Sequence, residues 1–122
     1  MNYEKGKKDI CERTFAFAVA IIEFCRSIEK GHTTERMLSR QLFRSGTSIG
    51  ANSEEAQAGQ SRPDFISKVS IARKEARETR YWLQLCRTTG IGMAGDIDRL
   101  LAEANELIAI LTAIIKNAKG IA

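Results

Sequence analysis

The amino-acid sequence predicts an all-α protein, an antiparallel up-down-up-down four-helix bundle. Proline occurs only once, at Pro63, and the segments between glycine-rich turns are long. Within these segments apolar residues recur at alternating steps of three and four, which is the period of one helix face. The predicted connections are short, so consecutive helices should be antiparallel neighbours. A chain of 122 residues is long enough for one domain, residues 1–122.

The first helix is expected at about residues 9–30, because Gly31 provides a helix stop. It carries two apolar stripes about a third of a turn apart, and such a helix needs two neighbours. The first stripe, which we expect to face the bundle, contains Cys11, Phe15, Ala18, Ile22 and Cys25. The second stripe contains Ile10, Phe17, Ile21, Phe24 and Ile28.

The second helix is expected at about residues 34–58, with Thr33 or Thr34 as its N-cap and Glu35 in its first turn. Its middle, RSGTSIGAN, consists of poor helix formers. Close packing against another helix through Gly46 and Gly50 would compensate for this. The alternative is a break that gives two shorter helices. A phosphate-binding loop is weakly supported, because no lysine follows in the GxxxxGK pattern.

The third helix, at about residues 62–89, has the clearest start, because Ser61 can cap it and Pro63 lies in its first turn. Its main apolar stripe contains Phe65, Val69, Ala72, Ala76, Thr79, Leu83 and Cys86. The fourth helix, at about residues 96–119, follows a turn with three glycines and is apolar around nearly half its circumference. Such surplus apolar surface on the first and fourth helices predicts self-association. Burial of that surface by loops within a monomer is the alternative.

Arginines are unevenly distributed, although the net charge is only +4. A first row on the third helix contains Arg73, Arg77, Arg80 and Arg87, with Lys74 beside it. A second row on the second helix contains Arg36, Arg40 and Arg44. Both rows are suited to a phosphate backbone and are therefore candidate nucleic-acid-binding residues. Equally, they could pair with the carboxylates of neighbouring helices or subunits, namely Glu54, Glu55, Glu75 and Glu78.

No catalytic site, metal site or cofactor site is predicted. His32 is the only histidine, and it lies in a predicted helix linker. A catalytic or metal site that needs two imidazoles is therefore excluded, and so is a metal cluster built from glutamate-histidine pairs on several helices. The three cysteines lie far apart without a CxxC pair, and we interpret them as reduced core thiols. The sequence therefore favours a protein that is not an enzyme.

The sequence also predicts no membrane association. It contains no run of about 18 uninterrupted apolar residues, which a membrane-spanning helix requires. Its basic start, MNYEKGKKDICER, lacks the apolar core of a signal peptide. We therefore expect a cytoplasmic protein.

Two segments resemble the four helix bundle family of 23S ribosomal RNA intervening-sequence proteins, also called the S23 ribosomal protein family. The first is RSxxSIxAN followed by an acidic residue, here Arg44, Ser45, Ser48, Ile49, Ala51, Asn52 and Glu55. The second places Phe65, Ala72, Glu78 and Leu83 at the family's positions. The sequence departs from the family where Ser53, Glu54 and Ala56 stand in place of the frequent Ile, Ala and Gly. The resemblance covers nearly the whole chain.

This resemblance implies an antiparallel four-helix bundle that assembles as a ring, typically a homopentamer. Genes of the family are often found inside insertions in ribosomal RNA genes, and the molecular function of most members is not established. The accessory variability proteins of diversity-generating retroelements are a related branch. Members of that branch have a basic surface and work with nucleic acid and a reverse transcriptase, so the resemblance implies such an enzyme as a possible partner.

The leading hypothesis is thus a non-enzymatic, self-associating bundle that binds RNA or DNA through the arginine rows. The competing hypothesis is a structural or protein-adaptor oligomer in which these arginines pair with glutamates. Asn52, on the apolar stripe of the second helix, is predicted to be a buried amide that specifies packing, with Glu78 or a serine hydroxyl as its partner.

Overall fold

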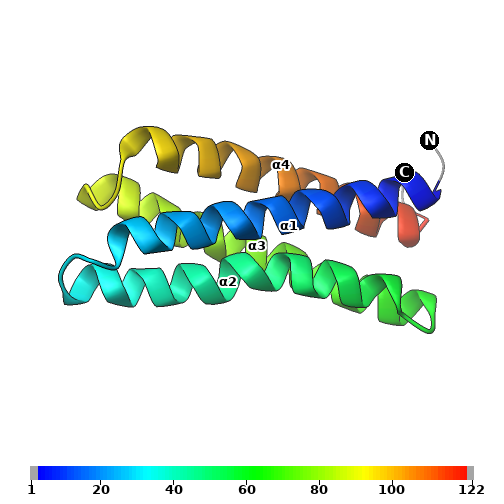
Figure 1. The fold of residues 1–122 in the computed structure, drawn as a ribbon. Coiled ribbons are helices and arrows are strands. Elements are labelled where there is room, and N and C mark those ends of the chain that lie inside the picture. Colours follow the sequence, from blue (N-terminus) through cyan, green and yellow to red (C-terminus); the bar gives the residue numbers. More distant parts are fainter. Residues whose placement is uncertain (1–2, 121–122) are drawn as a thin grey trace.

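A computed structural model describes the backbone of residues 3–120 and the side chains from residue 10 to residue 120. The described chain consists of four long helices joined by short loops, without a strand, as Figure 1 shows. They are α1 (Tyr3–Ile28), α2 (Thr33–Gln57), α3 (Arg62–Thr89) and α4 (Ala94–Ala118). None of these helices is long and apolar enough to cross a membrane. The predicted all-α fold class is confirmed.

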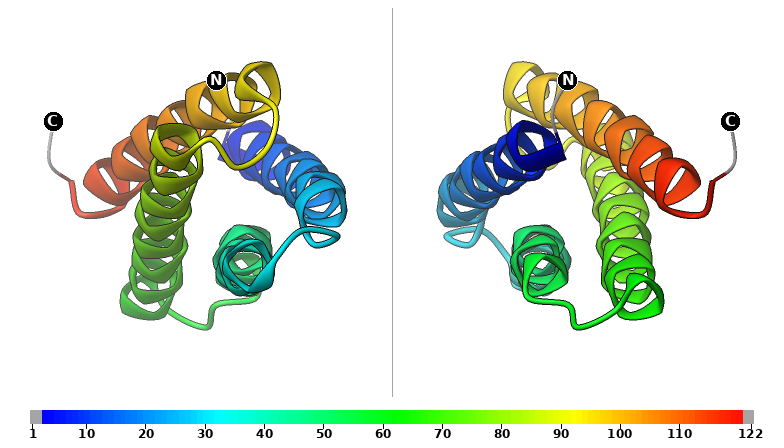
Figure 2. Two further views of the ribbon diagram at one scale, coloured as in Figure 1. Left: turned by 90° about the vertical axis from the view of Figure 1, so that its left-hand side faces the viewer. Right: turned by 90° about the vertical axis from the view of Figure 1, so that its right-hand side faces the viewer.

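The helices form an antiparallel up-down-up-down bundle. The beginning of α1 and the end of α4 lie at the same end of the molecule (Figure 1). Viewed from either end, the four helices surround a common centre (Figure 2). α1 packs against α2 and α4, and α3 packs against the same two helices. The backbones of the diagonal pairs, α1 with α3 and α2 with α4, do not approach each other closely in the described part of the chain.

The helix ends agree with the sequence to within a few residues, except at the start of α1. That helix begins at Tyr3 rather than near residue 9 and ends at Ile28 rather than near residue 30. The N-cap of α2 is His32, so the prediction of Thr33 or Thr34 is wrong by one or two positions. Ser61 caps α3 as predicted, because its hydroxyl accepts a hydrogen bond from the Asp64 N–H at 3.2 Å.

The α1 helix turns its second apolar stripe toward the core; the prediction that the first stripe faces the bundle holds for Cys25, which is buried, and is wrong for Phe15. Ile10, Phe17 and Ile21 are buried, whereas the side chain of Phe15 is 70% exposed. At a corner of the bundle one face of α1 points to the common centre. The stripe through Phe15 lies about a third of a turn away and points outward.

The middle of α2 is a continuous helix that packs closely against α1, so the predicted compensation by close packing is confirmed. A Cβ atom at Gly46 would lie 2.7 Å from Cγ2 of Ile21, and one at Gly50 would lie 3.3 Å from the Thr14 carbonyl oxygen. A side chain at Gly46 would collide with Ile21, and one at Gly50 would be tight against the α1 backbone, so the two glycines permit this close approach. Tertiary packing therefore offsets the low helix propensity of this segment.

Asn52 does not have the role predicted from the sequence. Its side chain is only half-buried, and its Nδ2 donates to the backbone carbonyl of Ser48 at 2.9 Å. A bond to the preceding turn satisfies the amide within its own helix. The polar contact at the core between α2 and α3 is made instead by Thr79, whose hydroxyl donates to the Ser45 hydroxyl at 2.8 Å.

Candidate nucleic-acid interface

The predicted arginines of α3 lie along its contact with α4. Arg73, Arg80 and Arg87 follow one another at seven-residue spacing and therefore share one face of the helix. Each reaches a polar residue of α4 that has the same spacing. The pairs are Arg73 Nη1 with Thr112 Oγ1 at 3.4 Å, Arg80 Nη1 with Asn105 Oδ1 at 3.0 Å, and Arg87 Nε with Asp98 Oδ1 at 2.9 Å.

We call Arg73, Arg77, Arg80 and Arg87 the α3 arginine row. Among the described side chains, the row has one ion-pair partner, Asp98, and the Arg87–Asp98 pair is itself largely exposed to solvent. Arg77 and the adjacent Lys74 are exposed and make no ion pair with any described residue. From Arg73 to Arg87 the row extends about 21 Å along the helix, at 1.5 Å per residue. It is therefore a long surface with excess positive charge.

The arginines of α2 are in a different environment. Arg44 forms ion pairs with Glu75, at 3.2 Å, and with Glu78 of α3. Trp82 Nε1 donates to Glu78 Oε2 at 3.4 Å, which adds a third group to this cluster. For Arg44, the predicted alternative of pairing with neighbouring carboxylates describes the structure.

Arg36 and Arg40, the other two members of the α2 row, lie toward the start of that helix. Arg36 donates to the Gly31 carbonyl oxygen at 3.3 Å and to the Thr33 hydroxyl at 3.4 Å. Arg40 is exposed and has no ion pair with a described residue. Because Arg44 reaches the α2 side of α3 while the α3 arginine row faces α4, the structure does not combine the two predicted rows into one surface.

The remaining residues of the RSxxSIxAN segment serve packing and local hydrogen bonding. Ser45 and Ile49 are buried in the core. The Ser48 hydroxyl donates to the Arg44 carbonyl oxygen at 2.6 Å, within the same helix. Glu55, the acidic residue that follows the segment, is exposed. This segment thus explains how α2 packs.

The thiols are unsuited to act as nucleophiles at neutral pH. Cys25 and Cys86 are buried, Cys11 is half-buried, and all three are free. Burial raises the pKa of Cys86 to about 11, and burial together with nearby Glu54 raises the pKa of Cys11 to about 11. Burial also raises the pKa of Cys25. In the part of the chain with described side chains, no three metal-ligating residues gather into a cluster.

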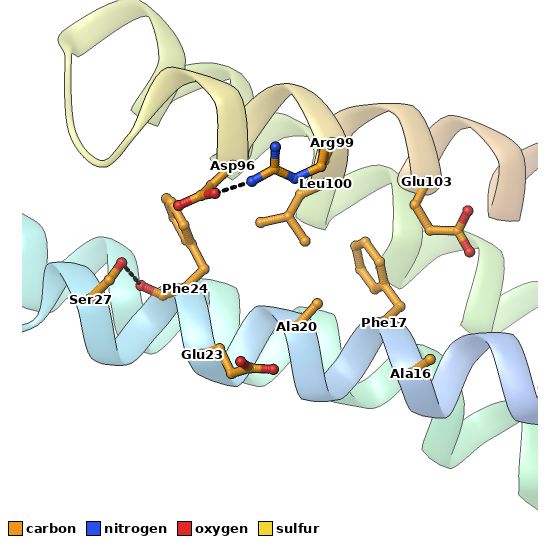
Figure 3. A pocket seen from close by; sticks show the side chains of 10 residues that line it. All are labelled: Ala16, Phe17, Ala20, Glu23, Phe24, Ser27, Asp96, Arg99, Leu100 and Glu103. Atoms are coloured by element: carbon orange, nitrogen blue, oxygen red, sulfur yellow. Dashed lines mark hydrogen bonds and ion pairs between the residues drawn. The ribbon is translucent and has the colours of Figure 1, made fainter.

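Two features of the molecule were not predicted from the sequence. One is the set of α4 partners of the arginines, which the shared seven-residue spacing of Asp98, Asn105 and Thr112 could have revealed. The other is a groove between α1 and α4 with a volume of about 490 Å³, shown in Figure 3. Its apolar lining is Ala16, Phe17, Ala20, Phe24 and Leu100, and its polar lining is Glu23, Ser27, Asp96, Arg99 and Glu103.

Fold and surface together define the class of protein: a four-helix bundle with an arginine-rich helix contact on one side and an apolar groove on another. More specifically, the chain belongs to the family of 23S rRNA-intervening sequence proteins, whose sequence pattern matches residues 6–113. The predicted family membership is thereby confirmed.

A crystal structure supports the same assignment. It is of a protein with unknown function from the S23 ribosomal protein family, from Bacteroides thetaiotaomicron VPI-5482. The two chains are 39% identical and superpose with a TM-score of 0.83, over 88% of this chain and 98% of that one. Comparison with curated proteins gives no match. Family and fold are therefore defined, whereas the molecular function has to be inferred from the surface.

Proposed function

We propose that this protein is a non-enzymatic, self-associating helical bundle that binds the phosphate backbone of RNA or DNA through the α3 arginine row. The observation that carries the proposal is the excess of arginine over carboxylate along 21 Å, about the rise of six successive phosphates in one strand of a duplex. The cytoplasm is the proposed location, and a nucleic-acid enzyme such as a reverse transcriptase is a candidate partner.

The hydrogen bonds of the row are compatible with phosphate binding. Arg73 and Arg80 bond to a neutral hydroxyl and a neutral amide of α4, so these bonds do not neutralise their positive charge. Each guanidinium has five N–H donors, and these bonds occupy only one of them. The Arg87–Asp98 pair is exposed to solvent, and such pairs contribute about 0–1 kcal/mol, so a phosphate could replace the carboxylate at little cost.

Self-association is supported by the apolar side chains that the bundle leaves outside. Phe15 and Val19 of α1 and Phe43 of α2 are exposed. Gly46 of α2 lies against Ile21 of α1, so Phe43 lies near the α1–α2 contact that the stripe of Phe15 also borders. Extended exposed apolar surfaces of this kind mark interaction sites. The homopentameric ring implied by the family resemblance would cover them.

Binding measured as a function of salt concentration tests the nucleic-acid part of this proposal. Fluorescence anisotropy with labelled duplex DNA, duplex RNA and single strands should give affinities that fall as salt increases. If four phosphates are contacted, the log–log slope for duplex DNA is expected to be about −3.6 per chain. Absence of binding at low salt, or a slope near zero, would rule out phosphate recognition.

The double reversal Arg77→Glu/Arg80→Glu locates the binding surface. It should abolish binding, or reduce the magnitude of the log–log slope by the contribution of about two phosphate contacts, while the oligomer remains intact. The matched control is Arg26→Glu/Lys30→Glu at the exposed end of α1, which changes the net charge equally and should bind far better than the row variant. Equal loss in both variants would indicate a response to net charge and would contradict a site at the row.

The second candidate function is that of a structural or protein-adaptor oligomer. The ion pairs of Arg44 with Glu75 and Glu78 favour it, because they show that arginines of this chain can serve helix packing. In that case Arg77→Glu/Arg80→Glu would dissociate the assembly and leave no nucleic-acid phenotype. Native mass measurement before and after RNase and DNase treatment reports subunit number and co-purifying nucleotides together.

A further inference from the structure

We infer that the groove between α1 and α4 receives the outer ridge of α3 from a second copy of the chain. The ridge consists of Ile71, Lys74 and Tyr81. The inference rests on the self-association proposed above and adds two surfaces that meet between copies, besides the exposed side chains of Phe15, Val19 and Phe43. It is independent of whether the protein binds nucleic acid.

The groove is an apolar recess that its own chain leaves open. Phe17 and Phe24 project from α1 toward α4, and Ala16 and Ala20 lie between and beside them (Figure 3). Leu100 of α4 forms the opposite wall (Figure 3). Ala16 and Ala20 are too small to fill the space beside Phe17, Phe24 and Leu100, and about 490 Å³ remains unfilled.

Contacts at both ends connect α1 to α4 and to the loop that precedes it. Near one end Arg13 Nη2 lies 2.6 Å from Glu103 Oε1 and connects α1 to α4. Near the other end the ring of Phe24 lies so close to Gly92 that a Cβ atom there would be 2.7 Å from the ring. The groove thus lies between two points at which α1 is tied to α4 or to the loop before it.

The outer ridge of α3 has the length and character to fill this recess. Ile71, Lys74 and Tyr81 are exposed, and their spacing of three and seven residues places them on one outward face. Ile71 and Tyr81 are about 15 Å apart along the helix, and the groove from Ala16 to Ser27 is about 16 Å long. An exposed isoleucine and tyrosine on one ridge are therefore matched to an open apolar groove of equal length.

The charges of the two surfaces are complementary. Asp96 pairs with Arg99 and Glu103 with Arg13, so each of these carboxylates already has a partner in its own chain. Glu23, at the edge of the groove, is exposed and makes no ion pair with a described residue. Lys74 is likewise exposed and unpaired among the described residues. A contact between copies can join these two charges, which favours this docking over other orientations.

Groove and ridge cannot meet within one chain. The groove belongs to the contact between α1 and α4, whereas α3 packs against α2 and α4 and not against α1. The contact therefore needs a second copy; if each copy offers its ridge to one neighbour and its groove to another, repeating the contact generates a closed ring or an open filament. Arg73, Arg80 and Arg87 face α4 beside the ridge, so these three arginines stay accessible in such an assembly.

Charge reversal and its compensation test the contact. Mass measured by light scattering over a range of protein concentrations should give an oligomer for the unmodified chain. Glu23→Lys and Lys74→Glu should each raise the dissociation constant at least about tenfold, and the double variant should recover most of that loss. Lys116→Glu, an exposed reversal at the end of α4 outside both surfaces, should assemble like the unmodified chain.

A second variant tests the groove without a change of charge. Ala20→Trp fills the recess, so it should prevent assembly while the helix content by circular dichroism stays unchanged. An unmodified chain that assembles while Ala20→Trp and both reversals assemble equally well would overturn this inference and leave self-association intact. An unmodified chain that is monomeric at every concentration would overturn the inference and the proposed self-association together.

Discussion

Two of the helix contacts in this bundle differ sharply in how they are built. Between α2 and α3 the contact is polar at its centre, where Thr79 bonds to Ser45, and charged at its edge, where Arg44 meets two glutamates. Between α1 and α4 the contact is apolar at its centre, where Phe17, Phe24 and Leu100 border a groove of about 490 Å³, and one ion pair, Arg13 with Glu103, joins the two helices.

Small residues also have different effects at the α1–α2 contact and at the α1–α4 contact. Gly46 of α2 brings the backbones of α1 and α2 together because the Ile21 side chain fills the space above it. Ala16 and Ala20 of α1 are also small, yet no side chain of the same molecule fills the space beside them. Gly46 thus lies against a large side chain of the neighbouring helix, whereas Ala16 and Ala20 border a recess.

The largest expected effect comes from truncating a core leucine on each side of this comparison. Leu83 of α3 is fully buried, so Leu83→Ala should lower the free energy of unfolding by about 4 kcal/mol. Leu100 of α4 borders the groove, and Leu100→Ala should cost about 2 kcal/mol, because its cavity adjoins an existing recess. Denaturant unfolding at one fixed protein concentration measures both values. Equal losses would mean that the groove is filled in solution.

The close approach of α1 and α2 should be nearly as sensitive to added volume. Gly46→Leu must displace Ile21 and is expected to destabilise the protein by about 3 kcal/mol, despite the better helix propensity of leucine. Gly95→Ala is the control, since its new methyl group would meet only the end of the Arg99 side chain, at 3.8 Å. Thermal unfolding should show no loss for the control. A neutral Gly46→Leu would mean that the helices can separate freely here.

The buried hydroxyl pair should have a smaller effect. Thr79→Val preserves the shape of the side chain and removes the hydrogen bond to Ser45, so we expect a loss of about 1 kcal/mol. Thr47→Val is the matched control, because Thr47 bonds only to carbonyls of its own helix near the surface. The two variants should differ in their denaturation midpoints. If they do not, the contact between α2 and α3 does not depend on this hydrogen bond.

The smallest expected effects concern the surface charges. Arg44→Ala and Arg13→Ala each remove an ion pair that joins two helices, and each should cost less than about 1 kcal/mol. The Arg44 pair should be less sensitive to salt, since Glu75 is mostly buried and screening acts mainly on exposed charges. Unfolding in low and high salt compares the two variants. A stronger salt response for Arg44 would contradict the interpretation of its cluster as part of the packing.

Most of the fold could be predicted because it depends on local patterns. The stripe from Val69 to Cys86 on α3 is buried as expected, and Ser61 caps that helix through the predicted hydroxyl group. The orientation of α1 could not be predicted, because both of its stripes have helical period and similar apolarity. Which stripe faces inward depends on how closely α2 approaches, and that is a property of the assembled bundle.

The candidate site was predictable only in part. The spacing of Arg73, Arg80 and Arg87 indicated a shared face, but the neighbour of that face depends on the order of helices around the bundle. The same order decides that Arg44 meets Glu75, a residue of α3 far away in the sequence. Pairings between side chains of different helices require the three-dimensional register, which a single sequence does not contain.

Cys25 and Cys86 are buried on facing helices, so the reaction of their thiols can be used to measure how often the bundle opens. A thiol reagent reaches these sulfurs only while the bundle is transiently apart, because both are almost completely shielded in the closed form. The rate at which Cys25 and Cys86 are labelled therefore follows the population of opened molecules, and no cysteine has to be introduced for the measurement. Any ligand that holds the helices together would slow that rate in proportion to its affinity.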